Sequence, residues 1–577
     1  MTISENELEA LEILKNQIGE SILEISKIER YSLGFHAENG HVIGLSLYSC
    51  GLSEIPKEIK LFSSLKVLYF RGNNLSSVTK ELFSLSNLEI LDLSENHLVE
   101  LPDLIGSLSS LKELHLETNQ LTTVPNNIGS LTSLELLDLS ENKLKHIPNT
   151  IGQIQSLKTL DLSGNKIEQL PPTIGMLNSL EILFLGNNKL SKLPDSITKL
   201  TSLKRLNLRN NNLINLPEAL GNLSSLTSLF LKGNNLEKLP KSIGEIKGLI
   251  YLGLTSNNLT HLPEDIGSLL SLENLSVSSN RLVKLPESIG SLKSLLRLEI
   301  SDNNLNMIPE SIGELSSMKI LRCERNNLQD IPYSVKNLST LEILQLNINK
   351  IKELPTSIGF LKSLKELNLY DNQLENLPES IGSLSSLEIL DLSKNLLKQL
   401  PPSIGSLRSL LELDISTNKL KNLPQTIGSL PMLKTLIIGF NKLIEIPKSL
   451  GFLTTLEILD LGKNKLISIP ETIGSLTSLK HLYLYYNDLD RIPESVGSLQ
   501  SLKYLYLGNN RLSILPESIG RLKKLKYLFL RSNYLTELPE SLELLPSLQY
   551  LNIEKNNLKG YLDYLHKLEI KGIKILK

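Results

Sequence analysis

The chain has 577 residues, with 60 lysines and arginines against 62 aspartates and glutamates, which gives a formal net charge of -2. This balance excludes the global basic field that attracts nucleic acid or an anionic membrane, so we predict no nucleic-acid partner. No run of about 18 apolar residues occurs, so we also predict no membrane span.

Residues 1–41 are predicted to form an N-terminal cap made of a helix and a hairpin strand. Apolar residues recur at helical spacing within Glu5–Ile18, and Gly19 follows, which is typical of an amphipathic helix that ends at a glycine. Asn39 and Gly40 form a strong hairpin signal between two extended segments, so we expect an antiparallel strand before the first repeat.

From residue 42 to residue 559 one pattern recurs every 23 residues. The segment 111–121, LKELHLETNQL, is a clear copy, and an asparagine takes its ninth position from Asn73 onward to Asn556. Cys50 takes this position in the first copy, which gives 23 repeats without an insertion. We therefore predict one uninterrupted repeat domain over residues 42–559.

Each position of the repeat has a physical role. Alternating leucines such as Leu114 and Leu116 indicate a short strand with one buried face, and stacked repeats place such strands in a parallel sheet. The asparagine follows the strand where the chain bends inward, and its amide can bond turn groups that would otherwise be unsatisfied. The stacked asparagines are therefore predicted to form a polar ladder.

Proline follows the ladder position by six residues in 21 of 23 repeats, from Pro56 to Pro539. Its fixed φ and missing N–H suit a turn, so the sheet should end there. The next segment, such as Glu379–Leu384, can turn its Ile and Leu inward on a short helical or 3₁₀ turn. These features predict an α/β repeat solenoid, a horseshoe or superhelix with a parallel concave sheet and short helical or 3₁₀ turns on the convex side.

Residues 560–577 are predicted to form a C-terminal cap. Leu562 replaces the proline of the repeat, and Leu565 and Leu568 follow at helical spacing. The end of a stack exposes apolar side chains and unpaired strand groups, so a segment that departs from the repeat pattern is expected there.

The sequence contains no phosphate-binding loop, dinucleotide fingerprint, zinc-protease motif, nucleophile elbow or CxxC pair. His36 and His41 form the one close histidine pair, and solvated hairpin residues are a better interpretation of them than half of a metal site. We therefore predict that the chain is not an enzyme and has no catalytic residues, no metal site and no cofactor.

The two cysteines, Cys50 and Cys323, lie twelve repeats apart, about 58 Å at about 4.8 Å per stacked strand, so they cannot form a disulfide within one chain. Unpaired thiols fit a reducing compartment. Residues 1–10 are acidic and lack the layout of a secretory signal, so we predict a cytoplasmic protein.

Three positions of each repeat, six, four and two residues before the ladder position, should point outward from the concave sheet. In the last four repeats seven of these twelve positions are aromatic, against six of the 57 in the other repeats. Tyrosines and arginines dominate interface hot spots, so we predict a partner-binding site there, although rings that only stack and stiffen this end are the alternative. The predicted site residues are Tyr483, Tyr485, Tyr504, Tyr506, Tyr527, Phe529, Arg531 and Tyr550.

A second partner-binding band is predicted where basic and aromatic residues share the outward positions, and it consists of Arg205, Arg209, Phe230, Lys232 and Tyr251. The outward positions of earlier repeats carry acids, and they include Asp92, Glu113, Glu117, Asp138 and Asp161. The aspartates of the LDLS motif are interpreted as solvated strand residues, and examples are Asp92, Asp138, Asp161 and Asp391.

The LxxLxLxxNxL segment together with residues 377–390, LPESIGSLSSLEIL, resembles the leucine-rich repeat family. Within it, the pattern is similar to an intracellular class that includes plant intracellular Ras-group repeat proteins, Scribble-type scaffolds and the animal Ras-pathway repeat scaffold. The resemblance implies a protein-binding concave face and, in several members, a small Ras-like GTPase or a phosphatase subunit as partner. No basic-Val-x-Phe docking peptide occurs near the N-terminus, which disfavours the phosphatase.

These observations predict a non-catalytic scaffold that binds a partner protein on its concave face, with a small Ras-like GTPase as the partner that the resemblance implies. The alternative function is a ligand-sensing or immune-type recognition receptor module.

Overall fold

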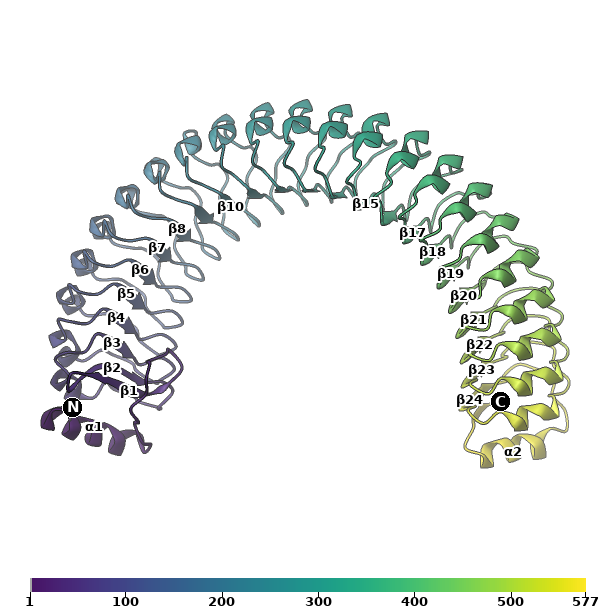
Figure 1. The fold of residues 1–577 in the computed structure, drawn as a ribbon, viewed down its shortest axis with the longest axis horizontal. Coiled ribbons are helices and arrows are strands. Elements are labelled where there is room, and N and C mark those ends of the chain that lie inside the picture. The colour runs from purple at the N-terminus through teal and green to yellow at the C-terminus, as the bar shows by residue number, and fades with distance from the viewer. Residues whose placement is uncertain (1–2) are drawn as a thin grey trace. The chain divides into compact units, whose positions relative to one another are not determined.

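The computed structural model describes residues 3–577. The chain divides into two compact units, Met1–Leu282 and Val283–Lys577. In each unit the strands line the concave side of a stack of repeats, and short 3₁₀ turns line its convex side (Figure 1). The predicted α/β repeat solenoid with a concave parallel sheet and convex 3₁₀ turns is therefore confirmed for the elements within each unit.

The first unit begins with helix α1 (Glu5–Ile18), which buries Ala10, Leu11 and Leu14 and packs beside the first 3₁₀ turn, Lys57–Leu61. Gly19 ends the helix with a φ of 74°, a left-handed conformation that glycine adopts without strain. Strand β1 (Leu33–Glu38) then pairs antiparallel with β2 (His41–Leu47), as the hairpin signal predicts.

Strand β2 opens the parallel part of the first unit's sheet by pairing with β3. The parallel strands that follow in this unit are β3 (Val67–Tyr69), β4 (Ile90–Asp92), β5 (Glu113–His115), β6 (Leu136–Asp138), β7 (Thr159–Asp161), β8 (Ile182–Phe184), β9 (Arg205–Asn207), β10 (Ser228–Phe230), β11 (Tyr251–Gly253) and β12 (Asn274–Ser276).

The second unit repeats the same arrangement and ends in helix α2 (Leu562–Ile570) and a final strand. Its strands are β13 (Arg297–Glu299), β14 (Ile320–Arg322), β15 (Ile343–Gln345), β16 (Glu366–Asn368), β17 (Ile389–Asp391), β18 (Glu412–Asp414), β19 (Thr435–Ile437), β20 (Ile458–Asp460), β21 (His481–Tyr483), β22 (Tyr504–Tyr506), β23 (Tyr527–Phe529), β24 (Tyr550–Asn552) and β25 (Lys574–Leu576).

The C-terminal segment covers the last repeat in two ways. Leu565 and Leu568 of α2 are buried, as their helical spacing predicts. The sequence pattern did not predict β25, which pairs parallel with β24 and so satisfies backbone groups of the last repeat's strand.

Buried asparagines hold the bend after each strand. The Nδ2 group of Asn142 donates to the carbonyl oxygens of Leu116, Leu139 and Ser140 at 2.9, 3.2 and 3.1 Å, and its Oδ1 accepts from the N–H of Leu121 at 2.9 Å. Each amide thus joins its own turn to the preceding repeat. The predicted polar ladder is confirmed, and it fixes the spacing of the concave strands.

The proline begins the 3₁₀ turn rather than interrupting it. In one repeat Pro102 has a φ of -71°, and its carbonyl oxygen accepts from the N–H of Ile105 at 3.0 Å. Ile105 then points into the core, where it is fully buried. These turns keep neighbouring repeats further apart on the convex side than on the concave side, where adjacent strands are hydrogen-bonded to each other. This difference in spacing bends the stack of each unit.

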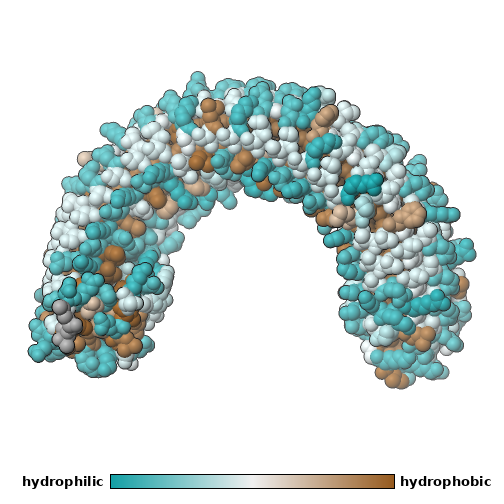
Figure 2. Space-filling model, viewed as in Figure 1, coloured by the Kyte–Doolittle hydropathy of each residue, from teal (hydrophilic) through white to brown (hydrophobic). Residues whose placement is uncertain are grey.

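Among residues 3–577, neither α-helix has the length and apolar composition that a membrane-spanning helix needs. In the view of Figure 2, hydrophilic residues and residues of intermediate hydropathy cover most of the visible face of each unit, and the hydrophobic patches are separate from one another.

Candidate partner-binding face

Aromatic side chains lie side by side on the concave face of strands β21 to β24. The strands are in parallel register, so that Tyr504 is paired with Tyr527 and Tyr506 with Phe529. Because hydrogen-bonded strands lie about 4.8 Å apart, rings at equivalent positions are brought to stacking distance. We call this set the aromatic ladder: Tyr483, Tyr485, Tyr504, Tyr506, Tyr527, Phe529 and Tyr550.

The ladder has two rows of stacked rings. One row lies six residues before the asparagine of the polar ladder in each repeat. In this row Tyr504 stacks on His481 with ring centroids 4.4 Å apart and on Tyr527 with centroids 4.9 Å apart. In the row two residues further along, Tyr506 stacks on Tyr483 at 4.6 Å and on Phe529 at 4.3 Å. The stacking alternative of the sequence analysis is thus observed, and it leaves ring edges and hydroxyls facing the concave side.

Tyr550 and Tyr485 complete the ladder at its two ends. Tyr550 lies 5.2 Å from Phe529 and 6.2 Å from Tyr527, both in tilted geometry. The ring of Tyr485 lies against Gly462, where an added Cβ would come within 2.4 Å of a ring carbon. Only glycine therefore permits this position of the Tyr485 ring.

Arg531, the remaining predicted residue of this site, is exposed and its guanidinium faces Glu554 at 3.7 Å. Among the described residues it stacks on no aromatic ring. The structure thus brings the seven aromatic residues together and places Arg531 at their border.

Most hydroxyls of the ladder are not used within the protein. The Tyr483 hydroxyl lies 3.5 Å from Nδ1 of His481. In the part of the chain that the structure describes, the hydroxyls of Tyr485, Tyr504, Tyr506, Tyr527 and Tyr550 make no hydrogen bond. Burial, followed by neighbouring Asp460 and other tyrosines, raises the pKa of Tyr483 and Tyr485, so these hydroxyls keep their protons at neutral pH.

The position seven residues before the ladder asparagine borders the concave sheet and is charged in most repeats, and we call these residues the edge row. Over much of the chain the row alternates glutamate and lysine, and several neighbours pair. Lys158 thus reaches Glu135 at 2.7 Å and Lys204 reaches Glu181 at 2.8 Å. These pairs offset their own charges, so they offer little to a partner.

The alternation of the edge row breaks beside the aromatic ladder. Lys480, Lys503 and Lys526 follow one another in adjacent repeats. Lys480 pairs with Glu457. Lys503 and Lys526 make no ion pair with any described residue. The edge row was not predicted from the sequence, although its 23-residue spacing could have shown it.

The second predicted band also forms a cluster, in the first unit. The guanidinium of Arg205 lies 5.1 Å from the ring centroid of Phe230, and that of Arg209 lies 4.5 Å from it. Tyr251 packs on Phe230 with centroids 4.7 Å apart, and Lys232 is exposed beside them. The two arginines and Tyr251 thus cover much of the Phe230 ring, so this band offers cations to a partner rather than free ring surface.

The interpretation of the acidic positions as solvated is wrong for Asp92, which is fully buried. Its Oδ2 accepts from Nε of Arg30 at 2.6 Å. Glu117 accepts from Arg30 at 2.7 Å and from Arg71 at 2.6 Å. We call these four residues the acidic clamp.

The acidic clamp needs an arginine from outside the repeats. Burial lowers the pKa of Arg30, but hydrogen bonds and charges from Asp92 and Glu117 outweigh it and raise the pKa overall. Arg30 belongs to the loop before β1, so no repeat register points to it. The contact could therefore not be inferred from the sequence pattern.

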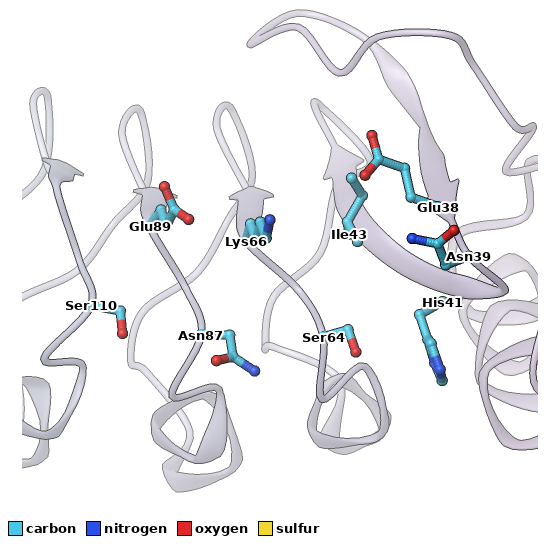
Figure 3. A pocket seen from close by; sticks show the side chains of 9 residues that line it. All are labelled: Glu38, Asn39, His41, Ile43, Ser64, Lys66, Asn87, Glu89 and Ser110. Carbon is cyan, nitrogen blue, oxygen red and sulfur yellow. The ribbon is translucent and has the colours of Figure 1, made fainter.

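A shallow polar pocket of about 420 Å³ lies beside the β1–β2 hairpin, between residues such as Glu38, His41, Lys66 and Glu89 (Figure 3). His41 faces Glu7, with Nδ1 3.6 Å from a carboxylate oxygen. His36 instead uses Nδ1 on the carbonyl oxygen of Ile25 at 3.0 Å. The two histidines have separate partners, which agrees with reading them as hairpin residues.

Two sets of family models match the chain. The family described as Leucine-rich repeat region matches residues 124–211, 199–276, 241–330, 310–388 and 359–437, which together span more than half of the chain. The family described as Leucine rich repeat matches residues 63–121, 431–489, 454–512, 486–534 and 500–558. A search of curated proteins finds no match.

Solved structures with similar folds come from plants and bacteria. The plant peptide hormone receptor RGFR1 in complex with RGF2 is 30% identical, with 94% of this chain and 93% of that chain covered and a TM-score of 0.69. A leucine-rich repeat protein of Leptospira interrogans is 32% identical over 77% of this chain and 96% of that one, with a TM-score of 0.54. YopM from Yersinia enterocolitica is 27% identical over 89% and 91%, with a TM-score of 0.57.

The repeat pattern, the strand and turn of each repeat, and the matches to family models and solved structures agree with one another. The chain belongs to the leucine-rich repeat family.

Proposed function

We propose that the chain is a non-catalytic interaction module that binds an extended, acidic segment of a partner protein on the concave face of β21 to β24. The observation that carries this proposal is the aromatic ladder, whose rings are held by stacking while most of its hydroxyls are unused within the protein. The predicted partner-binding residues are those of the ladder together with Arg531.

Stacking prepares the ladder for binding. A ring that is packed between two others has lost its side-chain freedom before a partner arrives, so binding costs less conformational entropy. Tyr504 and Tyr506 each lie between two such neighbours. The free hydroxyls can then donate to, or accept from, the backbone of an extended segment, which carries one donor and one acceptor per residue.

The edge row favours an acidic partner. Lys503 and Lys526 border the ladder without an ion pair among the described residues, whereas Lys158, Lys204 and Lys480 of the same row each pair with a glutamate. A carboxylate of a bound segment would supply the missing charge beside the aromatic contacts. Complementary charge of this kind mainly speeds association and selects the partner.

The ladder is less suited to nucleic acid or sugar. Those ligands bind by laying a base or a sugar face on an open aromatic ring. The inner rings of this ladder already have both faces covered by neighbouring rings. The ligand would have to break the stacks, so we favour a protein segment.

A peptide-receptor role is a second candidate, because the similar plant receptor RGFR1 was solved in complex with RGF2. A small Ras-like GTPase in the cytoplasm is a different partner for the same concave face, and it rests on the resemblance of the repeat to Ras-group proteins. The GTPase and a peptide differ in how they would bind. The GTPase should bind in a nucleotide-dependent way as a folded domain, and the peptide should bind as an isolated segment.

The first test is affinity capture from a lysate of the protein's own organism, followed by mass spectrometry. The intact chain is compared with two double variants. One carries Tyr506→Ala and Phe529→Ala, and the other carries Lys503→Glu and Lys526→Glu. We expect both variants to lose the partner that the intact chain holds. A recovered GTPase is then tested in its GTP-bound and GDP-bound forms, and a recovered short segment is tested as a synthetic peptide.

The matched control is the double variant Phe230→Ala and Tyr251→Ala, which removes the same kind of ring pair from the second band. It should retain the partner. Circular dichroism confirms that each variant is folded. If only the control loses the partner, the second band is the binding site and the proposal for the ladder is wrong.

A further inference from the structure

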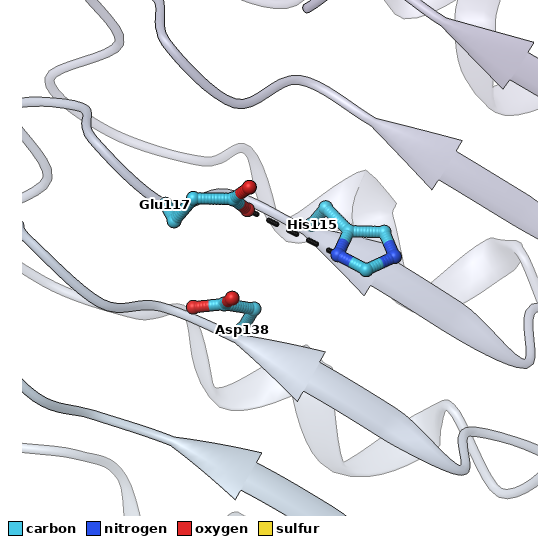
Figure 4. Close-up of side chains that lie close together, drawn as sticks. All are labelled: His115, Glu117 and Asp138. Carbon is cyan, nitrogen blue, oxygen red and sulfur yellow. Dashed lines mark ion pairs between the residues drawn. The ribbon is translucent and has the colours of Figure 1, made fainter. Parts of the chain in front are cut away.

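Three donor side chains meet on the concave face of the first unit, at strands β5 and β6. His115 ends β5, Glu117 follows two residues later, and Asp138 ends β6 in the next repeat. One nitrogen or oxygen atom from each lies within 4.8 Å of the other two. Figure 4 shows the imidazole facing the Glu117 carboxylate, with the Asp138 carboxylate beside it.

Two of these donor atoms are buried and make no hydrogen bond. They are Nδ1 of His115 and Oε2 of Glu117, which lie 3.9 Å apart. His115 is only 7% exposed. A buried polar atom without a hydrogen bond is costly, and it commonly marks a bound ion or water that completes the site.

The remaining atoms of the three side chains are held in place by other residues. Oε1 of Glu117 accepts from Arg30 and Arg71 of the acidic clamp. Nε2 of His115 faces Oε2 of Glu113 at 3.3 Å. A carboxylate on the far nitrogen of a histidine is the second contact that orients metal-binding histidines, and it leaves Nδ1 as the free donor.

Asp138 is held in the same way. Its Oδ1 accepts from the backbone N–H and the hydroxyl of Ser140 at 2.9 and 2.7 Å. These two bonds hold the Asp138 carboxylate at the end of β6, beside His115 and Glu117.

We propose that His115, Glu117 and Asp138 bind a divalent cation of the zinc class, with Nδ1, a Glu117 oxygen and an Asp138 oxygen as ligands. One imidazole with two carboxylates suits Zn²⁺, whereas Mg²⁺ prefers oxygen ligands and keeps most of its water. Three protein ligands leave a position on the concave side for water or for a carboxylate of a bound molecule. The ion joins two adjacent repeats.

The proposal departs from the prediction made from the sequence, which was that the chain has no metal site and which considered only His36 and His41 as a histidine pair for a metal. His115 has no second histidine near it in the sequence, and Asp138 lies one repeat away. Only the 23-residue register brings Asp138 beside β5. Counting outward positions of adjacent repeats together would have found the group.

The test is isothermal titration calorimetry of the full chain with ZnCl₂, after treatment with a chelator and dialysis. All proteins carry Cys50→Ser, because thiolates are zinc ligands and Cys50 is a half-buried free thiol. Burial and Glu20 raise the pKa of Cys50 to about 11, which disfavours its thiolate form. We expect one site per chain. Affinity should fall at least about tenfold in His115→Gln and in Asp138→Asn, and MgCl₂ should give no binding.

Asp161→Asn is the matched control. Asp161 occupies the same position one repeat later, bonds Ser163 as Asp138 bonds Ser140, and also has a pKa raised by burial, but it is not part of the donor group. This variant should bind Zn²⁺ as tightly as the parent. Zinc should also raise the melting temperature of the parent and of Asp161→Asn, but not that of His115→Gln.

Three outcomes would overturn the proposal. The first is no zinc binding by the parent. The second is unchanged binding by His115→Gln, which would place the ion at another of the eight histidines. The third is an equal loss in Asp161→Asn and Asp138→Asn, which would mean that any aspartate of this row attracts the ion through charge alone.

Discussion

The rings of the aromatic ladder and the acids of the acidic clamp occupy equivalent outward positions of the repeat, but their interactions with adjacent repeats differ in sign. In the ladder, adjacent repeats carry similar neutral rings, and a spacing of 4.3 to 4.9 Å between most neighbours lets them stack. In the clamp, adjacent repeats carry acids, which repel at the same spacing. Two arginines have to be inserted, and Arg30 comes from outside the repeats. Adjacent repeats can therefore carry similar rings at equivalent positions without further residues, whereas adjacent acids need arginines to offset their charges.

The largest expected effect is on the clamp. Glu117→Ala leaves Arg30 and Arg71 without a shared carboxylate in a largely buried site, so the free energy of unfolding of the first unit should fall by about 3 kcal/mol. Chemical denaturation measures the change. Glu95→Ala is the control, because the Glu95 side chain is 42% exposed and its pair with Arg71 should contribute less than about 1 kcal/mol. Equal losses would refute the contrast.

The next effect is on the ladder. Tyr506→Ala removes the ring between Tyr483 and Phe529, and each lost stacking contact is worth about 0.5 to 1.5 kcal/mol. We expect the free energy of unfolding of the second unit to fall by about 1 to 3 kcal/mol for the two contacts together. Tyr506→Phe keeps the ring and should keep the stability, which separates stacking from any effect of the hydroxyl. A large loss in Tyr506→Phe would contradict this account.

Acidification should weaken the ladder. Burial, followed by Lys503 and Lys480, lowers the pKa of His481 below its ordinary 6.5. Because the folded pKa is lower than the unfolded one, this contribution to stability is fully present above about pH 6.5 and is lost as the pH falls through the folded pKa. Melting temperatures measured between pH 5 and 7 should therefore decline at the acidic end. His481→Phe should reduce that decline, and an unchanged pH profile would show that His481 does not cause it.

Acidification should have the opposite effect on stability at the aspartates beside the acidic clamp. Burial raises the pKa of Asp161 above its ordinary 3.8, despite hydrogen bonds from Ser163. The stabilising contribution of the protonated form is present below the unfolded pKa and is lost as the pH rises through the folded pKa. Asp161→Asn should therefore be slightly more stable than the parent at neutral pH, as thermal melting can measure. If Asp161→Asn is less stable than the parent, the hydrogen bonds from Ser163 stabilise the charged Asp161 carboxylate by more than burial destabilises it.

Much of the ladder could be predicted from the sequence, because every one of its residues lies inside the repeat. The register alone identifies Tyr506 and Phe529 as neighbours, and the asparagine position shows which side they face. The sequence could not show that the rings would cover one another's faces, since stacking depends on side-chain torsions. That detail changes the expected ligand from a flat base or sugar to a protein segment.

The clamp could not be predicted to the same extent. Asp92 has the same LDLS surroundings as aspartates that stay partly exposed, and its burial is due to Arg30 from the capping loop. Strand β25 was missed for a related reason, since Lys574–Leu576 follows no repeat pattern and forms only because β24 offers an unpaired edge. Sequence periodicity describes contacts between repeats well and contacts with the caps poorly.

The most direct test of the proposed binding face is the affinity of one purified partner, obtained by the capture experiment, for three forms of the chain. The account predicts at least about a tenfold loss of affinity for Tyr506→Ala, and less than about a twofold loss for Phe230→Ala, measured by calorimetry under one salt concentration. Equal affinities for the parent and Tyr506→Ala, with a loss in Phe230→Ala, would contradict it and would assign binding to the Arg205 band.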